Sequence, residues 1–192
     1  MGDVRALVVV DVQPTFCEGG ELPVEGGNAV AEAIAGFAAA HRDRYGLVVT
    51  TQDWHVDPGD HFSATPDFVD SWPPHGLAGT PNAELHPALA DLAPDASVRK
   101  GQHAAAYSGF EGVDAAGRPL LDVLREAGVT DVDVVGIAES HCVLATALDA
   151  HAAGLHTRVL TDLTVPVTPA LGAAARDRLR AAGVTLTDSH AS

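Results

Sequence analysis

Three residues that could form a nucleophilic site each stand where a predicted strand ends. Cys142 follows the apolar run at residues 132–138, at the point where a helical pattern begins. Asp11 ends the apolar run at residues 6–10, and Lys100 closes a third, shorter run. Because the carboxyl ends of parallel strands meet at one edge of a sheet, a thiol, an acid and a base could converge there.

This arrangement predicts covalent catalysis by Cys142. Unpaired N–H groups at a helix start favour negative charge, and Ser140 is the predicted N-cap that would put Cys142 in the first turn. A free thiol has a pKa of about 8.5 and is mostly protonated at neutral pH, so it must be activated before it can act as a nucleophile. Asp11 suits a base that accepts the thiol proton, and Lys100 would offset the negative charge. The alternative for Cys142 is a buried, inert side chain.

A second candidate site lies in a proline-rich stretch at residues 53–87, which shows no sustained helical or strand period. Loops this long are usually functional or disordered, and the aromatic residues here favour order. Asp53, His55, His61 and His75 stand within it. Three imidazoles and one carboxylate suit zinc, manganese or ferrous iron, and the spacing does not choose among them. The alternative is ordinary loop histidines, since the chain has ten.

Strand and helix patterns alternate along the rest of the chain. Strands are predicted at residues 5–10, 47–51, 98–100, 132–138, 158–161 and 184–187, and helices at 28–42, with Asn28 as N-cap, 119–127, 140–154 and 169–182. Continuous apolar strands joined by helical crossovers predict a parallel sheet covered on both faces. We therefore expect an α/β fold, a three-layer α/β/α arrangement around a six-stranded, mainly parallel sheet, in a single domain at residues 1–192.

Composition narrows the expected partners and location. The formal charge of -15 disfavours nucleic acid and anionic membrane surfaces, which leaves a small-molecule substrate. The two cysteines, Cys17 and Cys142, do not form a disulfide framework, and no apolar stretch reaches about 18 residues. We expect a cytoplasmic protein with no membrane segment, either a monomer or a homo-oligomer.

Several motifs in a fixed order make the pattern more specific than any one motif would. They are ALVVVDVQ (6–13), FCEGG (16–20), QDWHVDPGDHFS (52–63), SWPPHG (71–76), YSGFEGVD (107–114), VDVVGIAESHCV (132–143) and TRVLTDLT (157–164). Together they resemble the nicotinamidase/pyrazinamidase branch of the isochorismatase-like hydrolases. The similarity runs from about residue 5 to residue 186 and implies the Rossmann-like fold of that superfamily.

The resemblance also implies roles for individual residues. It implies a catalytic triad of Asp11, Lys100 and Cys142 and a set of metal ligands formed by Asp53, His55, His61 and His75. It further implies a cis peptide between Ile137 and Ala138, oxyanion donors at the amides of Ala138 and Cys142, and a substrate pocket that includes Phe16, Trp72, Tyr107 and Ile137.

The implied activity is hydrolysis of a linear amide. Nicotinamide would become nicotinate and ammonia, and pyrazinamide would become pyrazinoate, through a thioester on Cys142 and with one divalent ion (Zn, Fe or Mn), in NAD salvage. Three alternatives remain open: a related amidase or carbamoyl hydrolase of the same superfamily, a metallohydrolase that uses metal-bound water, and a non-catalytic metal-binding or thiol-sensing protein.

The chain departs from the family pattern at three places. Pro14-Thr15 stands where relatives often have Asn-Asp, and Glu139-Ser140 stands where many have Thr-Asp. The second change removes a carboxylate beside the nucleophile, so we expect it to alter pKa tuning and turnover more than reaction class. Residues 103–106 also differ, which affects the expected pocket rim.

Overall fold

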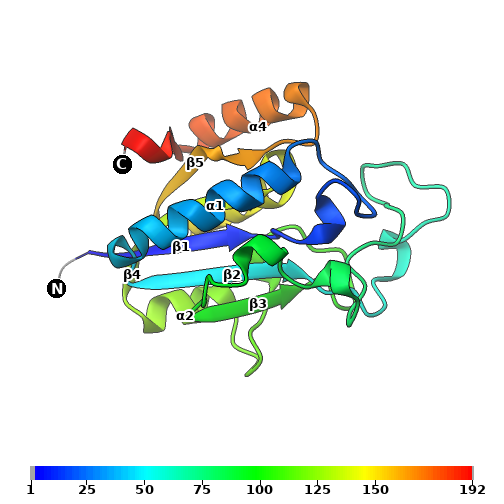
Figure 1. Ribbon diagram of the computed structural model, residues 1–192, viewed down its shortest axis with the longest axis horizontal. Coiled ribbons are helices and arrows are strands. Elements are labelled where there is room, and N and C mark those ends of the chain that lie inside the picture. The colour runs from blue at the N-terminus through cyan, green and yellow to red at the C-terminus, as the bar shows by residue number, and fades with distance from the viewer. Residues whose placement is uncertain (1–2, 192) are drawn as a thin grey trace.

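A computed structural model describes residues 3–191, and its centre is a six-stranded sheet in which every neighbouring pair of strands is parallel (Figure 1). The strands are β1 (Val4–Val10), β2 (Leu47–Asp53), β3 (Ala96–Lys100), β4 (Val129–Ile137), β5 (His156–Val165) and β6 (Thr185–Thr187), in the order β3-β2-β1-β4-β5-β6. The predicted six-stranded parallel sheet is confirmed.

Helices cover both faces of this sheet. The α-helices are α1 (Gly27–His41), α2 (Leu120–Glu126), α3 (Leu144–Ala152) and α4 (Pro169–Ala182). Short helical turns are η1 (Pro14–Phe16), η2 (Arg42–Arg44), η3 (Gly59–His61), η4 (Pro81–Ala83), η5 (Pro87–Leu89), η6 (Gly109–Glu111), η7 (Glu139–Val143) and η8 (Ser189–Ala191). Among residues 3–191, no helix combines the length and the apolar character that crossing a bilayer requires.

The central strand β1 shows why the three layers form. Ala6, Val8 and Val10 pack in one buried cluster with α2, α3 and α4, whereas Leu7 and Val9 pack in a second cluster with α1. Successive strand residues point to opposite faces of a sheet. A strand buried on both faces therefore needs an uninterrupted apolar run, which is the pattern that the sequence shows.

The start of α1 differs from the sequence-based prediction. Asn28 is not the N-cap, because the helix begins at Gly27 and Gly26 takes the capping position. The carboxylate of Glu18 accepts the N–H groups of Gly26, at 2.6 Å, and Asn28, at 2.8 Å. A side chain eight residues away thus satisfies the free donors that a local cap would otherwise satisfy.

The predicted loop at residues 53–87 begins one residue later than expected. Asp53 is the last residue of β2, where it pairs in register with Lys100 of β3. The loop itself is ordered by isolated bridges between His55 and Leu77 and between Phe62 and Trp72.

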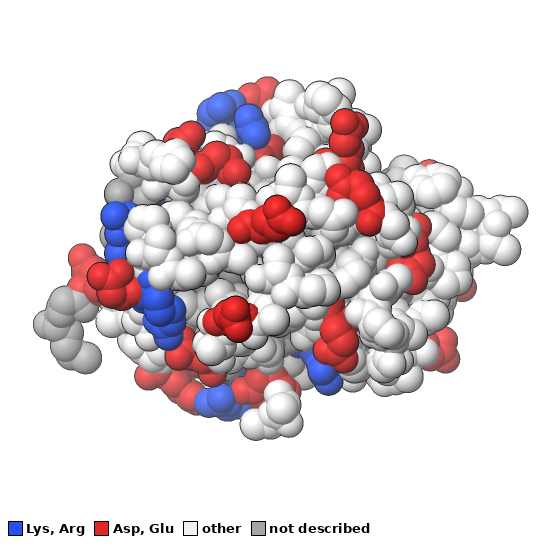
Figure 2. Space-filling model, in the orientation of Figure 1, with Lys and Arg blue, Asp and Glu red and all other residues white. Residues whose placement is uncertain are grey.

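Figure 2 shows acidic side chains scattered over the visible surface, with basic ones mostly at its margins.

Candidate active site

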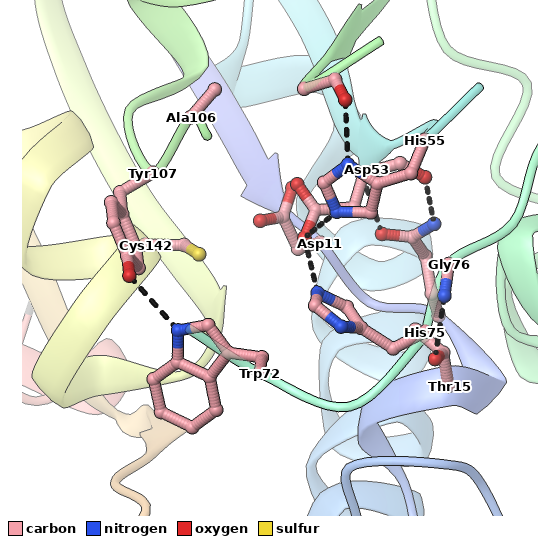
Figure 3. Close-up of polar contacts among 12 residues, drawn as sticks. Asp11, Thr15, Asp53, His55, Trp72, His75, Gly76, Ala106, Tyr107 and Cys142 are labelled. Atoms are coloured by element: carbon pink, nitrogen blue, oxygen red, sulfur yellow. Dashed lines mark hydrogen bonds and ion pairs between the residues drawn. The ribbon is translucent and has the colours of Figure 1, made fainter. Parts of the chain in front are cut away.

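The carboxyl ends of four strands bring the predicted catalytic residues together. Asp11 directly follows β1, Lys100 ends β3, and Cys142 lies in η7 after β4. The Lys100 ammonium group lies 2.8 Å from Asp11 Oδ2 and 3.8 Å from Cys142 Sγ, and it also forms an ion pair with Asp53 of β2. All four side chains are almost completely buried (Figure 3 shows three of them).

Burial and charge set the protonation of these groups. Burial raises the pKa of the Cys142 thiol well above its ordinary value, and the nearby Asp11 and Asp53 carboxylates add to the effect. Burial also raises the pKa of Asp11, and Asp53 adds to it, although Lys100 opposes the shift. Burial alone would lower the pKa of Lys100, but the two carboxylates outweigh it and raise that pKa. The resting site therefore holds a protonated thiol beside a lysine cation.

The turn that carries Cys142 differs from the prediction. Ser140 is not the N-cap, because Ala138 occupies that position and residues Glu139–Val143 form a wide π-helical turn before α3. The Ala138 carbonyl accepts the N–H groups of His141 and Val143, which closes the turn. The Ser140 hydroxyl instead accepts the N–H of Val167 at 3.2 Å. The peptide between Ile137 and Ala138 is cis, as the family resemblance implies.

The four predicted metal ligands also lie together. Ligand atoms of His55, His61 and His75 all fall within 4.8 Å of one another. Asp53 Oδ2 lies 3.5 Å from His55 Nε2 and 3.7 Å from His75 Nε2. Asp53 comes from the end of β2, and the chain that follows places His55 and His75 beside it (Figure 3).

The hydrogen bonds of the imidazoles prepare them to bind a cation. His55 Nδ1 lies 2.6 Å from the Gly101 carbonyl, and His75 Nδ1 lies 2.8 Å from the Pro73 carbonyl. Each Nδ1–H therefore donates to a carbonyl, and the Nε2 atom of each ring carries a lone pair that can bind a cation. Among residues 3–191, His55 Nε2 and His61 Nδ1 are buried without a hydrogen-bond partner. Unpaired buried nitrogens beside a carboxylate fit one divalent metal ion.

The electrostatics agree with this ligand set. Burial lowers the pKa of His61, and the neighbouring His55 and His75 add to the effect, so its lone pair stays available. Burial would raise the pKa of Asp53, but the Lys100 cation and the adjacent imidazoles outweigh it and hold that pKa well below its usual value. Asp53 therefore remains a carboxylate that faces both Lys100 and the imidazoles.

One cavity of about 470 Å³ joins the two groups of residues. Cys142 and Ala138 line it together with Asp53, His61 and His75. Its wall also includes the four predicted pocket residues Phe16, Trp72, Tyr107 and Ile137. Trp72 Nε1 donates to the Tyr107 hydroxyl at 3.0 Å, which ties the loop to the segment after β3 (Figure 3). The apolar walls and few polar groups suit a small aromatic ligand.

Sequence analysis missed part of this cavity. His141 lines it, with its ring 5.7 Å from the ring of Trp72 at a steep angle of 83°, and burial lowers its pKa. Its place directly before Cys142 was a signal that could have identified it. Leu22, Pro23 and Val167 also line the cavity, and no local sequence pattern marks them.

Comparison with known proteins gives consistent matches. The isochorismatase domain family matches residues 5–191. The nicotinamidase/pyrazinamidase of Mycobacterium tuberculosis is 55% identical over 186 residues, which cover 97% of this chain and 100% of that one. PnC1 from L. infantum, solved with nicotinate, superposes with a TM-score of 0.84 at 35% identity, over 98% of this chain and 94% of that one. The pyrazinamidase of Pyrococcus horikoshii, solved with zinc, superposes with a TM-score of 0.81 at 33% identity, over 96% of this chain and 98% of that one.

Proposed function

The chain belongs to the isochorismatase family, and we propose that within this family it is a nicotinamidase that hydrolyses nicotinamide to nicotinate and ammonia. It also hydrolyses pyrazinamide, which keeps both a ring nitrogen and the carboxamide. The observation that carries this proposal is a single cavity with Cys142 on one part of its wall and the ligands His61, His75 and Asp53 on another. Such a cavity can bind a ring and expose its carboxamide to the thiol at the same time.

The first half of the reaction forms a thioester on Cys142. Asp11 accepts the thiol proton, and the sulfur attacks the carboxamide carbon. The electron pair of the carbonyl moves to the oxygen, which the N–H groups of Ala138 and Cys142 stabilise. Asp11 then returns the proton to the leaving nitrogen, the C–N bond breaks, and ammonia departs. The raised pKa of Asp11 suits a group that both accepts and donates this proton.

The second half of the reaction releases the product. Asp11 accepts a proton from water, and the resulting hydroxide attacks the thioester carbon. The C–S bond breaks, Asp11 returns its proton to the sulfur, and the product leaves as nicotinate after its new carboxyl group loses a proton to solvent. Lys100, whose pKa is raised, stays charged throughout and offsets the negative charge that passes between Asp11 and Cys142.

Binding and orientation fall to the rest of the cavity. Phe16, Trp72, Tyr107 and Ile137 line the cavity and offer aromatic and apolar contacts to the ring. Asp53, His55, His61 and His75 would hold one divalent ion, which would supply an electrophilic anchor for the ring nitrogen; zinc, iron and manganese all suit this ligand set.

The wider context of the activity is part of the same proposal. The product nicotinate enters NAD salvage, and the enzyme acts as a single domain in the cytoplasm, as a monomer or a homo-oligomer. The formal charge of -15 supports a small-molecule substrate with no nucleic-acid or membrane partner, because phosphate groups would be repelled.

Ammonia release from nicotinamide and pyrazinamide tests the proposal. Cys142→Ala should lower kcat by at least about a thousandfold, because a covalent route has no substitute for the thiol. Cys17→Ala is the matched control: this thiol is also buried, its pKa is raised to about 11 by burial and by Glu18, and it lies in the core cluster with α1. The control should keep wild-type kcat.

The same assay separates the covalent route from hydrolysis by metal-bound water. If Cys142→Ala retained a substantial part of the activity and a chelator abolished it, the thiol would be a packing residue and the proposed route would be wrong. Trapping of turnover mixtures should reveal a nicotinoyl adduct on Cys142 by mass spectrometry.

A further inference from the structure

We propose that Glu139 and Arg176 form a clamp that positions the oxyanion hole, so that both are positioning residues for the reaction. The inference rests on the proposed function, since it concerns the same covalent step. Glu139 is the first residue of η7, and it lies between the two residues, Ala138 and Cys142, whose amides hold the oxyanion. Arg176 belongs to α4, which packs against this turn.

The contacts of Glu139 satisfy both of its carboxylate oxygens. Arg176 Nε donates to Oε1 at 2.8 Å, and Arg176 Nη2 donates to Oε2 at 3.0 Å. The hydroxyl of Thr164, on β5, donates to Oε2 as well. The paired, forked geometry of an arginine and a carboxylate fixes direction as well as distance. The side chain of Glu139 therefore ties η7 to both α4 and β5.

Because the Glu139 side chain is completely buried, its carboxylate needs a partner of opposite charge. The Glu139 side chain is 0% exposed, whereas that of Arg176 is 39% exposed. An ionised carboxylate without a partner in such a place would be strongly disfavoured. The helix also comes close at this point: a Cβ at Gly172 would lie 3.4 Å from Glu139 Oε1 and 2.8 Å from Pro166. The turn and α4 are thus packed at one defined separation.

The clamp affects chemistry because the turn is also the oxyanion hole. The Ala138 carbonyl receives the N–H groups of His141, at 3.0 Å, and Val143, at 3.2 Å, which fixes the peptide unit that directly follows the one carrying the Ala138 N–H. Small shifts of positioned groups, on the order of 1 Å, lower rates by about a hundredfold. A change that loosens Glu139 should therefore move the donors away from the oxyanion.

Charge adds a second effect in the same direction. The tetrahedral intermediate carries a negative charge, and an unpaired Glu139 carboxylate nearby would oppose it. Arg176 neutralises that carboxylate. Removing Arg176 alone should therefore be more harmful than removing both charges of the pair.

A set of four variants tests the clamp by steady-state kinetics. Arg176→Met breaks the pair, Glu139→Gln removes the charge at nearly constant size, and the double variant removes both charges. Arg158→Met is the control for loss of a forked arginine contact, at 2.7 and 2.6 Å, to a fully buried carboxylate, that of Asp133, which keeps its ion pair with Arg5. That pair lies near the start of β5, away from η7.

Nicotinaldehyde, the aldehyde counterpart of the substrate, reports on the oxyanion hole directly. The Cys142 sulfur adds to its carbonyl carbon, the thiol proton passes to Asp11, and the carbonyl electron pair moves to the oxygen. The bound adduct thus needs the same N–H donors as the reaction intermediate. Nicotinate forms no tetrahedral adduct with the thiol, so its inhibition reports mainly on the ring pocket.

For Arg176→Met we expect kcat to fall by about 10- to 100-fold with KM within about twofold of wild type, because the oxyanion interaction is absent in the ground state. Inhibition by nicotinaldehyde should weaken by a similar factor, and inhibition by nicotinate should not change. The double variant should recover only the part of the loss that comes from the unpaired charge and stay below wild type, because the contact that positions the turn is still absent. Arg158→Met should keep kcat within about twofold even if its Tm falls.

The clamp would be refuted if Arg176→Met and Arg158→Met lowered kcat equally, or if nicotinaldehyde inhibition were unchanged in Arg176→Met. Should Arg176→Met fail to fold, Glu139→Gln decides: a fall in kcat with parallel loss of nicotinaldehyde inhibition supports the clamp, and wild-type values refute it. A wild-type protein that released no ammonia would contradict the proposed function. An active wild type whose kcat and nicotinaldehyde inhibition were unchanged in Arg176→Met and Glu139→Gln would contradict the clamp alone.

Discussion

At the scale of single residues, the site depends on an imbalance of buried charge. Two carboxylates, Asp11 and Asp53, share one cation, Lys100, in a place with almost no solvent contact. Burial raises the pKa of Asp11 and of Cys142, and the Asp53 carboxylate adds to both shifts, although the Lys100 cation opposes them. The raised pKa favours the thiol form of Cys142 in the resting protein, and in the proposed reaction the proton leaves the sulfur as the carbon–sulfur bond develops.

This charge arrangement predicts the acid side of the pH profile. Asp11 must be ionised to accept the thiol proton, and its pKa is raised above the ordinary value of 3.8. As the pH falls through that raised value, Asp11 becomes protonated and kcat/KM should fall by about tenfold for each further pH unit. Steady-state rates measured from acidic to neutral pH, with metal content measured at each point, check this expectation.

The control for that profile is Asp11→Asn. It should lose nearly all activity and show no acid limb of its own, since an amide does not titrate in this range. An unchanged acid limb in Asp11→Asn, or activity that persists below pH 3.8 in the wild type, would show that another group is the base.

At the scale of elements, the turn after β3 supports the candidate metal site. Gly101 has a φ of +72°, and its carbonyl accepts from His55 Nδ1 at 2.6 Å. A Cβ at this glycine would lie 2.6 Å from His55 Cε1 and 2.8 Å from Nδ1, closer than real Cβ contacts. Both the backbone conformation and the available space therefore require glycine here.

We expect Gly101→Ala to weaken metal affinity by about 10- to 100-fold, because it displaces the ring of His55 and its orienting hydrogen bond. Gly117→Ala provides the control: its φ is +80°, so the backbone strain is similar, but no atom lies within 4 Å of the added Cβ. Competition with a chromophoric chelator gives both affinities. Equal loss in the two variants would mean that backbone strain, and not the contact with His55, is responsible.

At the scale of the whole molecule, the candidate metal ligands come from both the sheet and the long loop beside it. Asp53 is the last residue of β2, whereas His61 ends η3 and His75 follows it further along the loop. A bound ion would connect these segments in the folded state, and an unfolded chain would not keep the ligands together. Binding should therefore add to the free energy of unfolding.

Removing the metal should lower the melting temperature. A ligand present at about 100 times its Kd adds about 2.7 kcal/mol, and about 1 kcal/mol shifts Tm by roughly 2–4 °C in a chain of this size, so we expect a fall of roughly 5–10 °C with chelator. Reloading with zinc should restore the higher Tm, in Cys142→Ala as in the wild type. Identical melting curves with and without chelator would contradict a metal site built from these residues.

The amino-acid sequence alone determined the layered fold and the positions of the reactive groups. The continuous apolar runs predicted the parallel sheet because strands buried on both faces need them. The same pattern predicted that the polar residues at the ends of these runs, such as Asp11 and Lys100, lie close together, because the carboxyl ends of all parallel strands lie at one edge of the sheet. Both inferences depend only on neighbours along the chain.

The tertiary structure decided what depends on residues far apart in the sequence. The carboxylate of Glu18 sets the start of α1, and the closure of η7 on the Ala138 carbonyl, not a cap by Ser140, sets the turn that holds Cys142. The burial of Glu139 against Arg176, 37 residues later, follows from how α4 packs on that turn. No local pattern encodes these contacts, because each becomes favourable only after the sheet has brought its two partners together.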